Sequence, residues 1–393
     1  MRRTPALAFL LLTIFIDALG LGIVVPVVPA LLTSVSGGTA PAAYWSGLIN
    51  TGYPVLQFLF VPLLGRLSDR WGRRPILIGS LTLLGVDYLA HALASAPWLF
   101  ALAHALAGAF AGTWTVVNAY VADVIPSEDR LRAFGLIGAA FSLGFVAGPA
   151  VGGLLGDLDL RLPFLAAAAL AFANAGYGLL ILPESRRGDG TTSLNWSVAN
   201  PFSSILMVVR RPTLRRVTLA RFLGDLARMT NQVIWVFVMI ARFAWPTSRV
   251  GLLMAASAIV GTAASAWLSG PLVRRLGHRG AAVLTSLASA LSFVGFAVAP
   301  ADLLWLAIAA GCVGSIAGTA LQAWVTDLVG PDEQGTVQGA LASLGSLAEM
   351  CVPIVASALF AWSLTVGAPG LILVVAAGCV LVATVVIHHA PSS

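Results

Sequence analysis

Residues Gly65–Pro75, with the sequence GRLSDRWGRRP, are the most informative segment of this chain. Five charged side chains fall within its nine positions 66–74, whereas only 10% of all 393 residues are charged. Long apolar segments precede and follow it. Because a charged side chain is costly in hydrocarbon, we place this segment at a membrane surface, between two membrane-spanning helices.

The composition indicates an all-α membrane protein. Hydrophobic residues make up 59% of the chain, against about 45–50% in a typical soluble domain. A membrane-spanning helix needs about 20 residues, and only helices satisfy their own backbone in a bilayer without forming a closed barrel. The sequence predicts twelve such helices and no soluble domain. The predicted spans are 5–33, 42–67, 74–95, 97–124, 130–156, 162–183, 213–241, 247–273, 280–299, 302–328, 334–362 and 367–388.

The net charge is +6, from 22 arginines against 16 acidic residues, and the chain has no lysine. The arginines are scattered over short loops, which argues against a nucleic-acid partner. If both termini are cytoplasmic, seventeen arginines lie inside and only Arg161, Arg242 and Arg249 lie outside. Positive loops favour the cytoplasmic side, so we expect a multi-pass protein with both termini in the cytoplasm.

Neither an enzyme nor a metal or cofactor site is predicted. The three cysteines, Cys312, Cys351 and Cys379, fall within apolar spans without the spacing of metal ligands. The chain contains no Gly-x-Ser-x-Gly, His-Glu-x-x-His or nucleotide-phosphate motif. We therefore expect no catalytic residues.

A weak internal repeat divides the chain into two halves. Residues 65–74 align with 270–279 at an offset of 205, and 121–123 align with 325–327 at an offset of 204. Parallel repeats of this kind build many membrane transporters. The repeat predicts a six-helix bundle in residues 1–184 and a second in 213–393. Residues 185–212 would form a cytoplasmic linker, with an amphipathic segment at 196–209.

Ionisable residues inside the predicted spans are candidates for proton coupling. Such groups are functional by default, because burial disfavours the charged form. Asp225 and Arg228, one helical turn apart, could instead form a structural salt bridge, and each histidine could be a satisfied polar contact. The candidates are Asp17, Asp87, Asp225, Arg228, Glu349, His91 and His104.

Further polar and aromatic residues in the spans predict a substrate cavity. Aromatic faces with a few amides suit a small amphipathic substrate, although interhelical hydrogen bonding would explain any one of them equally well. The cavity candidates are Asp17, Tyr53, Gln57, Trp114, Asn118, Asn231, Gln232, Trp235 and Gln322.

Residues 144–153, with the sequence GFVAGPAVGG, combine small residues with a proline. Small residues four positions apart let helix backbones approach closely, and Pro149 removes a backbone hydrogen bond and bends the helix. Close packing between helices is the simplest interpretation of this segment.

The motifs together resemble a known transporter family. Residues 65–74 resemble the G-x-L-x-D-R-x-G-R-R loop of the major facilitator superfamily, and 144–153 resemble the antiporter motif of its drug–proton exchangers. Asp17–Pro29 (DALGLGIVVPVVP), Gln57 and Asp87–Leu89 are similar to bacterial tetracycline efflux proteins. The resemblance implies two pseudo-symmetric six-helix bundles, a monomer and a location in the bacterial inner membrane.

The resemblance also implies roles for the two motifs. The loop would latch the cytoplasmic side, with its arginines bound to loop carboxylates or to membrane lipid phosphates. The gating residues would be Gly65, Asp69, Arg70, Gly72, Arg73, Arg74 and Asp123. The antiporter motif, Gly144, Gly148, Pro149, Gly152 and Gly153, would seal the interface between the halves.

The chain departs from the family pattern at two places. His104 stands where helix four of the family carries an arginine, and residues 285–292 lack the aspartate of its helix nine. The sequence therefore predicts a proton-coupled multidrug or tetracycline-like efflux antiporter that works by rocker-switch alternating access, with protons and a small amphipathic molecule as its partners. A transporter of a metabolite or lipid-like molecule is the alternative.

Overall fold

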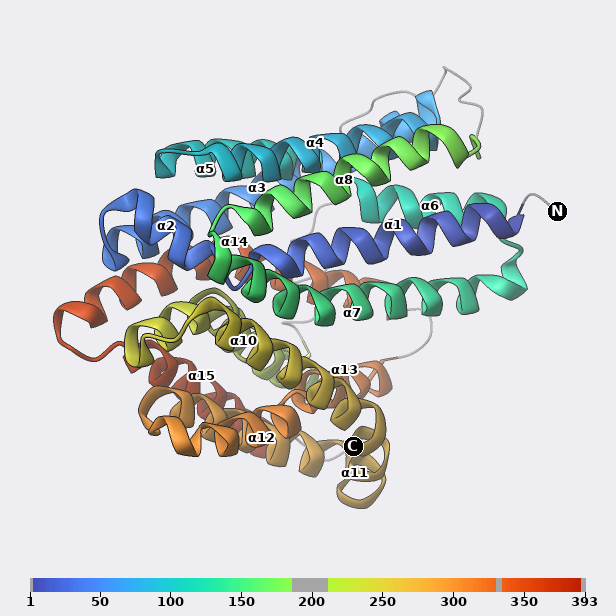
Figure 1. Cartoon of the computed structure of the whole chain (residues 1–393). Coiled ribbons are helices and arrows are strands. Elements are labelled where there is room, and N and C mark those ends of the chain that lie inside the picture. Colours follow the sequence, from blue (N-terminus) through green and yellow to red (C-terminus); the bar gives the residue numbers. More distant parts are fainter. Residues whose placement is uncertain (1–2, 186–210, 330–333, 390–393) are drawn as a thin grey trace. The chain divides into compact units, whose positions relative to one another are not determined.

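A computed structural model describes residues 3–185, 211–329 and 334–389 (Figure 1). Among these residues the regular structure is helical throughout, without a β-strand. The helices are α1 (Arg3–Val24), α2 (Val28–Ser36), α3 (Thr39–Trp71), α4 (Arg73–Leu93), α5 (Pro97–Ala109), α6 (Thr113–Val124), α7 (Ser127–Leu158), α8 (Leu162–Ile181), α10 (Pro212–Phe243), α11 (Thr247–Val298), η1 (Ala301–Leu303), α12 (Leu304–Gly314), α13 (Ile316–Asp327), α14 (Gln334–Thr365) and α15 (Leu371–His388).

The prediction of an all-α membrane protein is confirmed. Ten helical stretches of the described chain are long and apolar enough to cross a bilayer. One of them, α11, holds two of the predicted spans, since Gly277 interrupts its helical backbone angles. α10 is not among the ten because it carries Arg221, Asp225 and Arg228 besides the charges at its ends. With these two adjustments the twelve predicted helices are all present.

Three predicted spans are broken by short irregular segments. The predicted span 5–33 divides into α1 and α2 around Pro26, which cannot donate a helical hydrogen bond. The span 97–124 divides into α5 and α6 at residues 110–112, and the span 302–328 divides into α12 and α13 at Ser315. Hydropathy alone did not reveal these breaks, because the segments remain apolar across them.

Two compact units make up the chain. The first contains Met1–Trp196 and Trp245–Ala255, and the second contains Ser197–Ala244 and Ala256–Ser393. The start of α11 therefore belongs to the first unit. The predicted domain boundaries at 184 and 213 stay a prediction, and the predicted amphipathic segment at 196–209 lies outside the described residues.

The glycines of residues 144–153 place α7 directly against α1, which runs beside it (Figure 1). A Cβ atom on Gly148 would lie 2.5 Å from Gly22 Cα, and one on Gly152 would lie 1.8 Å from the Ile23 carbonyl oxygen. Glycine at these positions is thus required for the two backbones to touch, as small residues permit between membrane helices. The contact adjoins a buried core that includes Phe9, Ile14 and Ile137.

We predict that Gly152→Val destabilises the first unit, because its side chain would have to displace the backbone of α1. Gly138→Val in the same helix is the matched control, since nothing lies within 4 Å of a Cβ atom there. The expected cost of overpacking is about 1–3 kcal/mol, seen as a lower unfolding temperature in detergent for Gly152→Val alone. Equal unfolding temperatures for the two variants would contradict the described contact.

Candidate functional site

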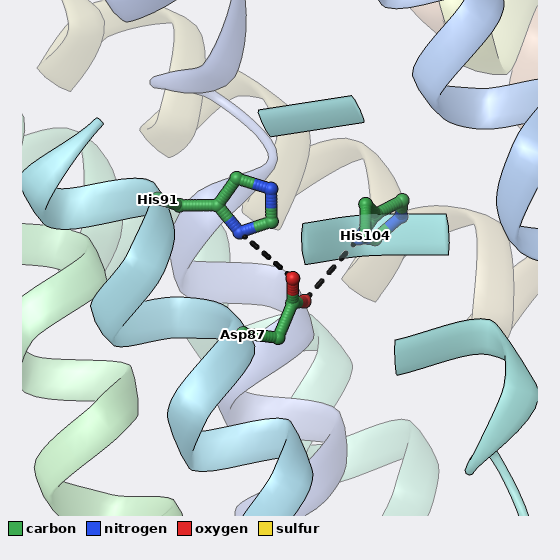
Figure 2. Close-up of side chains that lie close together, drawn as sticks. All are labelled: Asp87, His91 and His104. Carbon is green, nitrogen blue, oxygen red and sulfur yellow. Dashed lines mark hydrogen bonds and ion pairs between the residues drawn. The ribbon is translucent and has the colours of Figure 1, made fainter. Parts of the chain in front are cut away.

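Asp87 lies between two imidazole rings in the first unit (Figure 2). His91 follows it by one turn of α4, and its Nδ1 lies 3.2 Å from Asp87 Oδ1. His104 comes from α5, and its Nδ1 lies 3.3 Å from Asp87 Oδ2. Asp87 and His91 are almost fully buried, at 3% and 5% exposure, whereas His104 is partly exposed. The structure thus brings together three residues that the sequence predicted separately as proton-coupling candidates.

Aromatic rings fix the positions of both histidines. Tyr53 of α3 stacks on His104, with 4.7 Å between the ring centroids. Phe100 and Phe164 pack against His91, with ring centroids at 4.8 Å and 5.8 Å. Of the predicted cavity residues, Tyr53 therefore belongs directly to this cluster.

Asp17, on α1 of the same unit, has a different environment. Its side chain is half-buried, and it accepts no hydrogen bond and forms no ion pair with the described residues. The negative charge of Asp17, like that of Asp87, acts on the hydroxyl groups of Tyr53 and Tyr88. Asp17 is thus an uncompensated carboxyl group beside the cluster.

Asp225 in the second unit is held by two arginines of its own helix. Arg221 Nε lies 3.0 Å from Asp225 Oδ2, and Arg228 Nε lies 3.6 Å from Oδ1. The sequence predicted Arg228 as the partner, but Arg221 is the closer one and the less exposed. Its position four residues before Asp225 was a signal that the sequence offered.

Arg221 also joins Asp225 to α13 and α14. It donates to the carbonyl of Gly318 at 3.0 Å and to Gln322 Oε1 at 3.2 Å. Gln322 in turn donates to Gln338 Oε1 at 2.5 Å. Gln322, a predicted cavity residue, is therefore part of a hydrogen-bond network, and Arg221 and Gln338 are members that the sequence did not identify.

The other predicted residues of the cavity are spread over both units. Gln57 on α3 and Asn118 on α6 are half-buried, and Trp114 is exposed. On α10, Gln232 accepts a hydrogen bond from Arg228, Asn231 has a buried Oδ1 without a described partner, and Trp235 is buried against Phe296. Glu349 on α14 is exposed and has no described partner.

Arg73 is the centre of the charged loop between α3 and α4. Its guanidinium lies 2.7 Å from Asp69 Oδ1 and 3.0 Å from Asp123 Oδ2, and donates to Ser68 Oγ at 2.6 Å. Ser68 itself donates to the carbonyl of Gly65. Arg73 is only 6% exposed, and it joins the predicted gating residues Asp69 and Asp123, which are more exposed, into one ionic group. Arg70 is half-buried.

Glu184 completes this loop and was not predicted as a functional residue. Its carboxylate accepts the backbone N–H groups of Arg73 at 2.7 Å and of Arg74 at 3.2 Å. These N–H groups begin α4, where a carboxylate is favoured by the helix dipole. Gly72 precedes them with φ +100°, and a Cβ atom there would lie 2.4 Å from the carboxylate. Only glycine lets Glu184 reach the start of α4.

The second copy of the loop has a related arrangement with different chemistry. At the repeat offset, Gly277 corresponds to Gly72, and it too has a positive φ, of 67°. His278 corresponds to Arg73, and its Nε2 lies 2.9 Å from Asp327, the counterpart of Asp123. The repeat thus preserves the backbone turn and the ion pair, with histidine in place of arginine.

The glycine motif of α7 also contacts the beginning of α11, within the first unit. Thr247 donates to the carbonyl of Gly153 at 3.0 Å and to Asp157 Oδ1 at 2.6 Å. The backbone N–H of Ser248 donates to the same carboxylate at 3.1 Å. A Cβ atom on Gly251 would lie 2.0 Å from the carbonyl oxygen of Pro149. The motif therefore packs closely on two sides, and Asp157 caps α11.

Comparison with known proteins agrees with the predicted resemblance. A model of the Major Facilitator Superfamily matches residues 10–353 and 217–392. The tetracycline resistance protein of class C from Escherichia coli is 36% identical over 369 residues, 92% of this chain and 91% of that protein. The class G protein from Vibrio anguillarum is 34% identical over 94% of this chain and 92% of its own length.

Solved structures show a similar fold. The human organic anion transporter MFSD10 aligns with a TM-score of 0.65 and 23% identity over 98% of this chain and 99% of its own. The nucleoside transporter NupG aligns with a TM-score of 0.79 and 15% identity over 98% of each chain. At these identities the likeness concerns the fold alone.

We predict that Gly72→Ala lowers the unfolding temperature more than Gly277→Ala. Both substitutions strain a positive φ with an extended ψ, by about 1–3 kcal/mol. Only at Gly72 must the added methyl group also displace a helix-capping carboxylate, worth about 0.5–2 kcal/mol more. In a Glu184→Ala background the two substitutions should cost the same. An equal effect of both substitutions in the unmodified chain would contradict the described contact.

Proposed function

Because the chain belongs to the major facilitator superfamily, we propose that it is a proton-coupled efflux antiporter for tetracycline or similar planar, amphipathic drugs. The similarity to tetracycline resistance proteins supports the substrate class, since it extends over more than nine-tenths of the chain. We further propose that it works as a monomer in the bacterial inner membrane, with both termini in the cytoplasm.

The lack of a partner for Asp17 carries the proposal of proton coupling. Of the four carboxyl groups predicted within spans, Asp87 has an imidazole at each oxygen and Asp225 has two guanidinium groups. Glu349 has no described partner, but its side chain is exposed. Asp17 alone combines partial burial with the lack of any ion-pairing or hydrogen-bonding partner among the described residues. We therefore assign the exchanged proton to Asp17.

The position of Asp17 fits this role. It lies roughly 20 Å along α1, which is about 33 Å long at 1.5 Å per residue. An ionised carboxylate at that depth is unfavourable unless a proton or a ligand compensates it. Proton and substrate would therefore compete for Asp17: a proton taken up from outside displaces the drug, and a drug bound from the cytoplasm releases the proton. Such competition couples the two fluxes in opposite directions.

We assign the cytoplasmic latch to the loop around Arg73. Its guanidinium is shared between Asp69 and Asp123, so it connects the end of α3 with the end of α6. An arginine keeps its charge at every physiological pH. The latch would therefore open through rearrangement of the helices rather than through loss of charge on Arg73.

We predict that Asp17→Asn abolishes drug-dependent proton flux in proteoliposomes. The amide cannot bind and release a proton, so drug transport is no longer coupled to proton transport. The measurement uses an internal pH dye, an imposed proton gradient and added tetracycline. Asp302→Asn, which changes an exposed carboxylate outside the predicted cavity, should leave the flux unchanged.

Two results would contradict this account. Normal proton flux in Asp17→Asn would remove Asp17 from the coupling mechanism. The absence of flux with any planar drug, from wild-type protein that is shown to be folded, would favour the alternative of a metabolite or lipid-like substrate.

A further inference from the structure

We propose that Asp87, His91 and His104 form a binding site for one divalent transition-metal ion of the zinc class. The sequence predicted no metal site. His104 lies 13 residues after His91 and on another helix, so their approach is a feature of the fold. In the structure their ligand atoms, with one carboxylate oxygen of Asp87, all lie within 4.8 Å of one another (Figure 2). Two imidazoles and a carboxylate are ligands that zinc accepts in open sites.

The ligand atoms lie nearly as close together as those around a tetrahedral ion. Zinc lies about 2.0–2.2 Å from nitrogen and oxygen ligands, so two ligands on a tetrahedron are about 3.3–3.5 Å apart. Each histidine Nδ1 atom lies at about this distance from a different oxygen of Asp87, 3.2 Å for His91 and 3.3 Å for His104. The three ligand atoms, which include one oxygen of Asp87, lie within 4.8 Å of one another, so a bound ion would draw the three side chains closer together.

One oxygen of Asp87 lacks the hydrogen bond that a buried carboxylate requires. Oδ1 is buried and accepts no hydrogen bond from the described residues, although His91 Nδ1 is 3.2 Å away. Buried polar atoms are nearly always satisfied, and a buried carboxylate oxygen without a hydrogen bond is unfavourable. A cation bound at Oδ1 and the two imidazoles would remove this deficit.

The surrounding structure holds the ligands in place. Asp87 and His91 occupy one face of α4, four residues apart. The stacked Tyr53 orients His104, and Phe100 and Phe164 enclose His91. Metal sites depend on such support, because the packing around the ligands fixes their orientation and limits the access of water. Here the helix and the packed aromatic rings provide that support.

A groove along α4 and α5 reaches the site at Asp87. It has a volume of about 450 Å³, and Asp87 is the one charged residue in a wall that is otherwise apolar, with Leu83, Leu99 and Leu106 among its members. Three protein ligands leave one position of a tetrahedral ion open. Water, or a donor atom of a molecule in the groove, would fill that position.

The test is metal binding by the purified full-length protein in detergent, without a polyhistidine tag. Calorimetry with Zn²⁺ should give one site per chain, and Co²⁺ should give the visible absorption of a tetrahedral nitrogen–oxygen site. His104→Asn and His91→Asn should each weaken Zn²⁺ binding at least 10-fold. His278→Asn, which changes the other described histidine–aspartate pair, should leave the affinity unchanged.

A further variant separates ligand loss from misfolding. His104→Cys retains a zinc ligand of similar reach, and it should bind Zn²⁺ while shifting the Co²⁺ spectrum towards that of a thiolate site. The proposal is overturned if the wild type binds no Zn²⁺ saturably, or if His104→Asn binds as tightly as the wild type. It is also overturned if His278→Asn weakens binding as much as His104→Asn does.

Discussion

The unfavourable free energy of an uncompensated charge in a bilayer governs how this chain uses its few ionisable residues. At helix ends, Arg161 and Arg242 are compensated by backbone carbonyl groups. Arg161 donates to the carbonyls of Ala92 and Ala94 at the C-terminal end of α4, and Arg242 donates to those of Phe296 and Ala299 at the C-terminal end of α11. Cations are favoured at helix C-termini, where carbonyl groups lack helical partners. Deeper in the spans, Asp87 and Asp225 have side-chain partners instead. Asp17 differs, because it has no ion pair or hydrogen bond with any described residue.

Close backbone packing is the second constraint on the structure. The glycines of α7 bring it against α1 on one side and against the start of α11 on the other. At the charged loop, Gly72 provides both the positive φ and the space for Glu184. Rigid elements of this kind allow a transporter to change between discrete arrangements, because close-packed contacts are either made or broken.

The sequence predicted the twelve helices well, since hydrophobic length follows directly from the thickness of the bilayer. The breaks near Pro26, at residues 110–112 and at Ser315 were missed, because they leave the hydropathy unchanged. The candidate residues were also identified one by one, but not their grouping. The pairing of Arg221 with Asp225 could have been read from their spacing of four residues, but its link to α13 could not. Glu184 was missed because its role depends on the start of α4, which is remote in the chain. The approach of His104 to Asp87 depends likewise on the packing of α5 against α4.

The central claim is that drug and proton compete for one uncompensated carboxyl group. The most direct test measures protons released when drug is added to the purified protein in weakly buffered detergent solution. The account predicts about one proton released per bound drug molecule from wild type and from Asp302→Asn, and none from Asp17→Asn although it still binds drug. Drug binding by wild type without proton release, or equal release from Asp17→Asn, would contradict it.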